Sequence, residues 1–200
     1  LLYLPVDTAI NRYYDQGSTN AAQLPGLQQR TREAIETYPH HRYWDGLSLL
    51  HFLQAADTGR RLNERRQSFE AVIETAEESL ALAPAQPRTW LRVAQARSWL
   101  RYPPEQVIDA LKMAIYTGRV EPSMFLTRLV LGMAYLPRMD GEGRAMMRDQ
   151  LLLAWQMQRA VTVRAIRSGE LRMAPIETLL ADAHENVLEE MREVAGGAAR

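Results

Sequence analysis

Apolar residues recur at helical spacing along most of the chain from Leu24 onward. A period near 3.6 residues places such side chains on one face of a helix, and the clearest stripe comprises Phe69, Val72, Ile73, Ala76 and Leu80. The sequence contains no convincing run of alternating β-branched residues, which would be typical of strands. The pattern therefore predicts an all-α protein.

Proline and glycine bracket the periodic stretches, as they do at helix termini. They predict helices at about 26–38, 42–57, 64–82, 87–101, 103–118, 121–137, 141–157, 158–168 and 175–194, after a short helix within 7–14 and a loop at 16–20. Asp140 is expected to cap the helix at 141–157. The stretch 124–136 is apolar nearly all round except for Thr127 and Arg128, which predicts a central, buried helix of the C-terminal half. The stretch 175–194 has the strongest amphipathic pattern in the chain.

Composition narrows the classes of function. The chain has 24 basic and 24 acidic residues, so no net positive charge points to nucleic acid. The absence of cysteine excludes disulfides, zinc–thiolate sites and cysteine nucleophiles. Only Lys112 among the basic residues is lysine, which reflects either arginine-rich codon usage or an arginine surface for carboxylate, phosphate or sugar-acid groups. The first explanation is favoured.

Motifs that carry chemistry are scarce. The sequence has no glycine-rich phosphate loop and no GxSxG elbow. His40, His41, Asp45 and His51 could supply metal ligands, but their spacing favours a loop pair and a histidine at the edge of the core. Charged runs are expected to be solvated or ion-paired, namely Glu74, Glu77 and Glu78, and Arg60, Arg61, Arg65 and Arg66. We therefore expect no enzyme, cofactor or metal.

Residues 87–96, Pro-Arg-Thr-Trp-Leu-Arg-Val-Ala-Gln-Ala, resemble the first helix of a tetratricopeptide repeat. Trp90, Val93 and Ala94 have the spacing of that repeat, and Ala110 and Ala114 resemble the small residues of its second helix. Residues 79–84 look like the end of a preceding unit, although Trp44 and Trp90 lie 46 positions apart, so about twelve residues are inserted within 57–68. The resemblance covers roughly 42–136.

This resemblance implies stacked antiparallel helical hairpins, an α-solenoid. It predicts an irregular segment at 1–25, hairpins at 26–136, C-terminal helices packing on the solenoid at 137–195, and a flexible tail at 196–200. In the family, the first helix of each unit lines a concave groove that binds a partner. The partner-binding residues expected from this are Arg42, Asp45, Phe52, Arg88, Gln95 and Trp99. Trp99 lies about half a turn away from the Trp90 stripe, so it either anchors a partner or, as the more favoured alternative, packs against the neighbouring unit.

The run 111–129 is similar in texture to bacterial envelope-associated tetratricopeptide proteins linked with polysaccharide assembly. The sequence thus favours a non-catalytic interaction module that binds a protein or peptide, in the periplasm or anchored to a membrane. Membrane association would require a segment outside this chain, which starts at Leu1 without methionine and is expected to be a trimmed or processed product. The alternatives are a homo-oligomer or complex docking through the C-terminal helices and, third, an enzyme whose site spans several helices.

Overall fold

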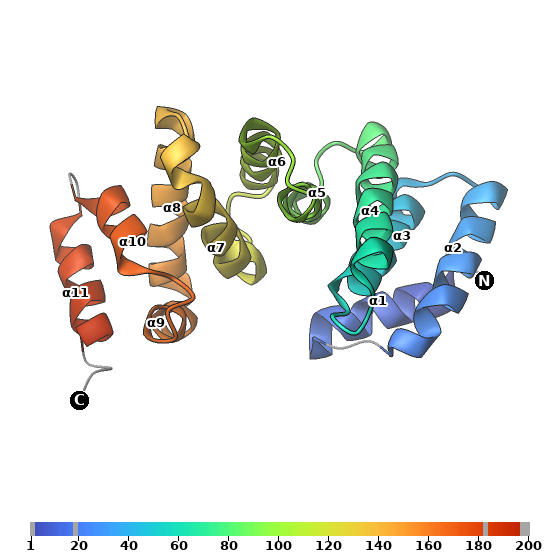
Figure 1. The fold of residues 1–200 in the computed structure, drawn as a ribbon, viewed down its shortest axis with the longest axis horizontal. Coiled ribbons are helices and arrows are strands. Elements are labelled where there is room, and N and C mark those ends of the chain that lie inside the picture. The colour runs from blue at the N-terminus through green and yellow to red at the C-terminus, as the bar shows by residue number, and fades with distance from the viewer. Residues whose placement is uncertain (1–2, 18–19, 182–183, 197–200) are drawn as a thin grey trace. The chain divides into compact units, whose positions relative to one another are not determined.

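The computed structural model describes residues 3–17, 20–181 and 184–196. Within these ranges the protein is all-α, with helices that pack against one another and no strand (Figure 1). The helices are α1 (Leu4–Gln16), α2 (Leu24–Thr37), α3 (His41–Ala56), α4 (Leu62–Leu82), α5 (Pro87–Trp99), α6 (Pro104–Tyr116), α7 (Phe125–Tyr135), α8 (Gly141–Met157), α9 (Arg159–Arg167), α10 (Met173–Leu180) and α11 (Glu185–Gly196). Short 3-10 turns occupy Ala21–Gln23, Pro122–Met124 and Leu136–Arg138.

The chain divides into two compact units, Leu1–Ala110 and Leu111–Arg200, and the division falls within α6. In unit 1, α3 and α4 lie side by side, α2 packs on α3, and α5 packs on α4 (Figure 1). Ala55, Phe69, Val72, Ile73 and Ala96 form a buried core cluster among α3, α4 and α5. These packed helices are compatible with a helical-repeat architecture.

The N-terminal helix α1 packs on α2 and α3. It contributes the buried side chains Tyr3 (from its N-cap) and Val6 to a second core cluster. The approach to α3 is close at Gly46, where an added Cβ atom would collide with the Tyr3 hydroxyl. Any larger residue would force Tyr3 to shift, so glycine in the middle of α3, despite its low helix propensity, allows the close approach of Tyr3.

In unit 2, α7 packs on α8 and α9, while α11 packs on α9 and α10. Gly132 of α7 faces Met147 of α8 at a distance that leaves no room for a Cβ atom. Asp140 caps α8 as predicted, because its Oδ1 accepts a hydrogen bond of 2.7 Å from the backbone N–H of Gly143.

Two predictions about the helices need correction. The single helix predicted at 175–194 is wrong, because α10 ends at Leu180 and α11 begins at Glu185. The break allows α10 and α11 to pack on each other, so that Leu179 and Leu180 of one and Leu188 and Met191 of the other are all buried. A straight helix would keep its apolar stripe on one line and could not fold it back on itself.

The second correction concerns Arg128, which we assigned to the polar face of the apolar helix and which is instead fully buried in α7.

The N-terminal helix is longer than the predicted 7–14. The tail predicted at 196–200 lies outside the described residues beyond Gly196, as do Ser18 and Thr19 of the predicted loop. Within the described part of the chain, every helix is too short or too polar to cross a bilayer.

Candidate functional site

The six side chains predicted to bind a partner come from two helices that contact each other in unit 1. Arg42, Asp45 and Phe52 lie on α3, and Arg88, Gln95 and Trp99 lie on α5. Their surroundings differ along this face. One end is engaged by other groups of the unit, and the end near Trp99 borders a hollow.

Asp45 pairs with the buried Arg92, a residue that the sequence analysis did not single out. The Arg92 Nη1 atom donates to the Asp45 carboxylate at 2.9 Å and to the Asp45 backbone carbonyl at 3.1 Å. The Thr89 hydroxyl donates to the same carboxylate at 2.5 Å. Burial alone would raise the pKa of Asp45, but the Arg92 charge and these hydrogen bonds outweigh it and lower the pKa below its usual value. The carboxylate thus joins α3 to α5.

Arg42 and Arg88 are engaged by α1. The Asp7 carboxylate lies 3.5 Å from the Arg42 guanidinium, and the Tyr3 hydroxyl donates to the Arg42 carbonyl at 2.9 Å. The Arg88 guanidinium lies over the Tyr14 ring, 4.3 Å from its centroid. The surface expected to be an open groove is therefore occupied at this end by the N-terminal helix.

Phe52 and Trp99 belong to a stack of rings beside the core of unit 1. The Phe69 ring lies 6.0 Å from that of Phe52 in an edge-on arrangement and 4.5 Å from that of Trp99. The Arg65 guanidinium covers the Trp99 ring at 5.3 Å, and its Nε donates to the Ala55 carbonyl at 2.8 Å. Trp99 is half-buried, so its ring is held in place while part of it remains accessible.

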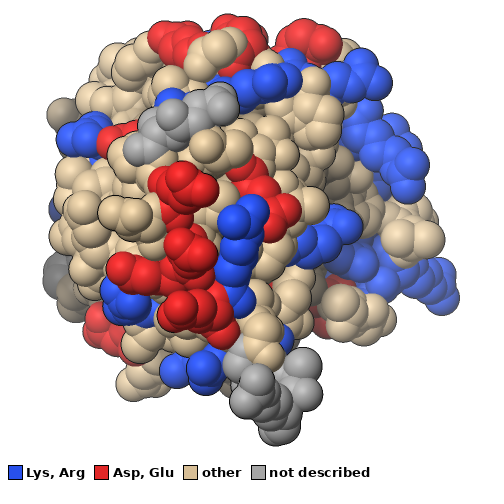
Figure 2. All heavy atoms as spheres, turned by 90° about the vertical axis from the view of Figure 1, so that its left-hand side faces the viewer, with Lys and Arg blue, Asp and Glu red and all other residues tan. Residues whose placement is uncertain are grey.

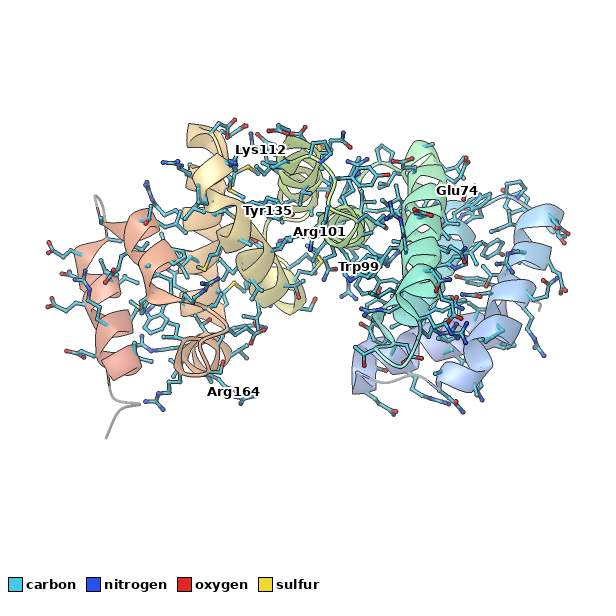
Figure 3. All side chains as sticks on the ribbon, in the orientation of Figure 1. Glu74, Trp99, Arg101, Lys112, Tyr135 and Arg164 are labelled. Atoms are coloured by element: carbon cyan, nitrogen blue, oxygen red, sulfur yellow. The ribbon has the colours of Figure 1, made fainter. Side chains whose placement is uncertain are left out.

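The accessible part of Trp99 borders a hollow of about 740 Å³ between the start of α4 and the end of α5. We call it the Trp99 hollow, and its lining residues are Leu62, Asn63, Arg66, Ser98, Trp99, Leu100 and Arg101. Leu62, the first residue of α4, is 73% exposed. Figure 3 labels Trp99 and Arg101 at the end of α5. The hollow combines an apolar surface with an arginine-bearing rim.

Arg101 has a left-handed backbone, with φ of 60°. Its N–H donates to the Ser98 carbonyl and the Tyr102 N–H donates to the Arg97 carbonyl, at 3.1 and 2.9 Å. These two bonds form a Schellman motif, in which glycine usually occupies the left-handed position. Sequence reasoning missed this residue because arginine carries no signal for a left-handed conformation.

His51 and the acidic residues of α4 contact other side chains of unit 1 or face solvent. His51 is close to Gln28, with 3.3 Å between the Gln28 Nε2 and His51 Nδ1 atoms, and burial lowers the pKa of His51 to about 4. Glu77 pairs with Arg97 at 3.1 Å, and Glu74 is exposed on α4 (Figure 3). Across the residues that the structure describes, no three His, Asp or Glu side chains gather in a way that could hold a metal ion.

Polar side chains in unit 2 mainly join helices. The buried Arg128 donates to the Ala114 carbonyl at 2.6 Å, in the last turn of α6, and to the Gln150 side chain at 2.9 Å. The positive charge thus lies at the negative end of a helix. Lys112 contacts Asp140 at 2.9 Å and Glu142 at 2.6 Å, which connects α6 to the start of α8.

The outer side of α11 is strongly acidic. Figure 2 shows acidic side chains gathered on this face of the molecule with basic side chains among them. Glu185, Glu189, Glu190 and Glu193 are exposed on α11, and Glu190 pairs with Arg159 at 2.7 Å.

Comparisons of the chain with protein-family models, with curated proteins and with solved structures found no match.

Proposed function

We propose that this chain is a non-catalytic interaction module, built from helical hairpins of the tetratricopeptide type, which binds a protein or peptide partner at the Trp99 hollow. A single observation carries the proposal: Trp99 is fixed by Phe69 and Arg65 while part of its ring faces a hollow beside the exposed Leu62. A pre-positioned aromatic residue loses little conformational entropy on binding, and tryptophan and arginine dominate the binding energy of many interfaces. The likeness of 111–129 to envelope-associated repeat proteins extends the proposal to an envelope or polysaccharide-assembly setting.

A homo-oligomer or complex formed through the amphipathic C-terminal helices has less support. Ile176, Leu179, Leu180, Leu188 and Met191 are all buried, so the apolar stripes of α10 and α11 are already in use. The exposed side of α11 is charged.

Selection of peptides from a displayed random library on the immobilised protein tests the proposal. We expect enriched peptides to bind the natural protein and to lose affinity for Trp99→Ala. Because that substitution removes ring packing on Phe69 and is expected to lower stability, Leu62→Ser serves as a second variant that removes only exposed surface.

The matched control is Leu82→Ser, since Leu82 is 54% exposed at the other end of the same helix. Enriched peptides that bind Leu62→Ser and Leu82→Ser equally well would place the site elsewhere. A selection that enriches no peptide over one carried out on Trp99→Ala would contradict the proposal.

A further inference from the structure

The rim of the Trp99 hollow carries positive charge without a matching number of carboxylates. Arg66 forms an ion pair with Glu70, with 3.1 Å between the Arg66 Nε and Glu70 Oε1 atoms. Arg101 is exposed, and so is Arg61, the N-cap residue of α4 that precedes Leu62. For neither of these two arginines does the described part of the chain provide an ion pair. Among the lining residues of the hollow, Arg101 is therefore an uncompensated cation, and Arg61 adds a second one directly before the lining residue Leu62 in the chain.

The backbone of Arg101 adds an independent observation. A left-handed conformation is unfavourable for a residue with a Cβ atom, and glycine avoids this cost. Two backbone hydrogen bonds impose the conformation regardless of the side chain. An arginine with no ion pair therefore occupies a position where glycine would stabilise the fold. Residues held in costly backbone conformations cluster at functional sites.

From these two observations, and resting on the function proposed above, we propose that the Trp99 hollow binds an acidic peptide segment. An apolar side chain of the segment lies against Leu62, Trp99 and Leu100, and a neighbouring carboxylate pairs with Arg101. Charge complementarity selects this occupant, because the exposed Arg101 lines the same hollow as the apolar side chains of Leu62, Trp99 and Leu100.

A nucleic-acid strand fits this surface less well. Binding of such a strand depends on many phosphate contacts along a basic groove. Here Arg66 is shared with Glu70, and the chain as a whole has equal numbers of basic and acidic residues. A membrane surface of anionic lipid would likewise require a larger cluster of free cations.

The test uses the full chain and the peptides enriched from the random library. We expect these peptides to be rich in Asp and Glu around one large apolar residue. Replacing their carboxylates by amides is expected to weaken binding, as is Arg101→Gly, by about two- to fivefold for one exposed ion pair. Arg101→Lys keeps the charge and is expected to retain most of the affinity for the peptides. Arg167→Gln removes an exposed charge in unit 2 and is expected to leave the affinity unchanged.

Thermal unfolding provides a second readout. If Arg101 had a purely structural role, its replacement would not weaken peptide binding and raise the unfolding midpoint at the same time. Arg101→Gly is expected to weaken peptide binding and to raise the unfolding midpoint by about 2–4 °C. The midpoint rises because glycine adopts the left-handed conformation without the cost that a Cβ atom imposes, and a stabilisation of this kind shifts the midpoint by that amount in a chain of this length. A loss of affinity with a lower midpoint would indicate a damaged fold and would overturn the inference.

The outcomes separate this inference from the proposed function. If the enriched peptides are neutral or basic, or if they bind Arg101→Gly unchanged but lose affinity for Leu62→Ser, the acidic segment is refuted and the interaction module stands. If no peptide is enriched, both fail. Binding of single-stranded DNA or of phosphatidylserine vesicles that depends on Arg101, together with neutral peptides, would also overturn the acidic-peptide assignment.

Discussion

Removal of one partner of the Asp45–Arg92 ion pair is expected to have very unequal effects. The Arg92 side chain is 5% exposed, whereas that of Asp45 is 29% exposed. Asp45→Ala leaves a cation that water cannot reach, and the expected cost is about 3 kcal/mol in the free energy of unfolding. Arg92→Met leaves a carboxylate that keeps contact with water and with the Thr89 hydroxyl, so its expected cost is about 1 kcal/mol.

The double variant Asp45→Ala with Arg92→Met gives the decisive comparison. Because it contains no stranded cation, it is expected to be more stable than Asp45→Ala alone, by about 1–2 kcal/mol. Additive costs would instead make it the least stable of the three. The pair also contributes to acid stability, since a lowered pKa of Asp45 stabilises the fold above the unfolded value near 4 and the stabilisation is lost as the pH falls through the folded pKa.

Urea unfolding followed by tryptophan fluorescence measures these differences. Unit 1 contains Trp44, Trp90 and Trp99, and unit 2 contains Trp155. A Trp155→Phe background therefore restricts the signal to the unit that holds the ion pair. If Arg92→Met proves as destabilising as Asp45→Ala in this background, the reasoning from burial is refuted.

Three further predictions concern other sites. Burial keeps His51 neutral in the folded protein between pH 6.5 and 4, where the unfolded histidine takes a proton, so the natural protein is expected to lose up to about 3 kcal/mol of unfolding free energy over this range, at about 1.4 kcal/mol per pKa unit. His51→Gln is expected to remove most of this loss. Urea unfolding of both proteins at pH 7 and pH 4.5 measures it, and an equal loss in the variant would contradict the prediction. Gly46→Ala is expected to displace Tyr3 and cost about 1–3 kcal/mol, seen as faster hydrogen exchange in α1; unaltered exchange would count against the close approach. Arg128→Ala is expected to cost about 3 kcal/mol and Arg128→Met distinctly less in thermal or urea unfolding, because methionine fills much of the buried space that alanine leaves empty; equal losses would show that the lost hydrogen bonds, and not the lost packing, set the cost.

Helix boundaries follow closely from the sequence because they depend on local chemistry. Proline occupies the first turn of α5 and α6, and Asp140 caps α8. Such signals act over three or four residues, which a single sequence displays directly. The break between α10 and α11 was missed because the apolar spacing continues across it, and only packing against other helices favours two elements over one.

The polar contacts of the candidate site depend on tertiary structure. Thr89 and Arg92 lie 44 and 47 positions from Asp45, so their pairing cannot be inferred from spacing within a helix. Helical periodicity singles out Trp99 as lying away from the Trp90 stripe, but its contact with Phe69 depends on how α5 packs on α4. The burial of Arg128 has the same origin, because its partners belong to α6 and α8.

The position of α1 has a consequence for the order in which unit 1 can form. Tyr14 stacks under Arg88, which lies 74 positions later in the chain, and Tyr3 bonds to the Arg42 carbonyl. During synthesis, α1 emerges before α3 and α5 and must therefore wait for them before its contacts can be completed. Until then Tyr3 and Val6 remain exposed, and the neighbouring face of α3 lacks its cover. Contacts of this sequence separation slow folding and prolong the lifetime of exposed apolar surface.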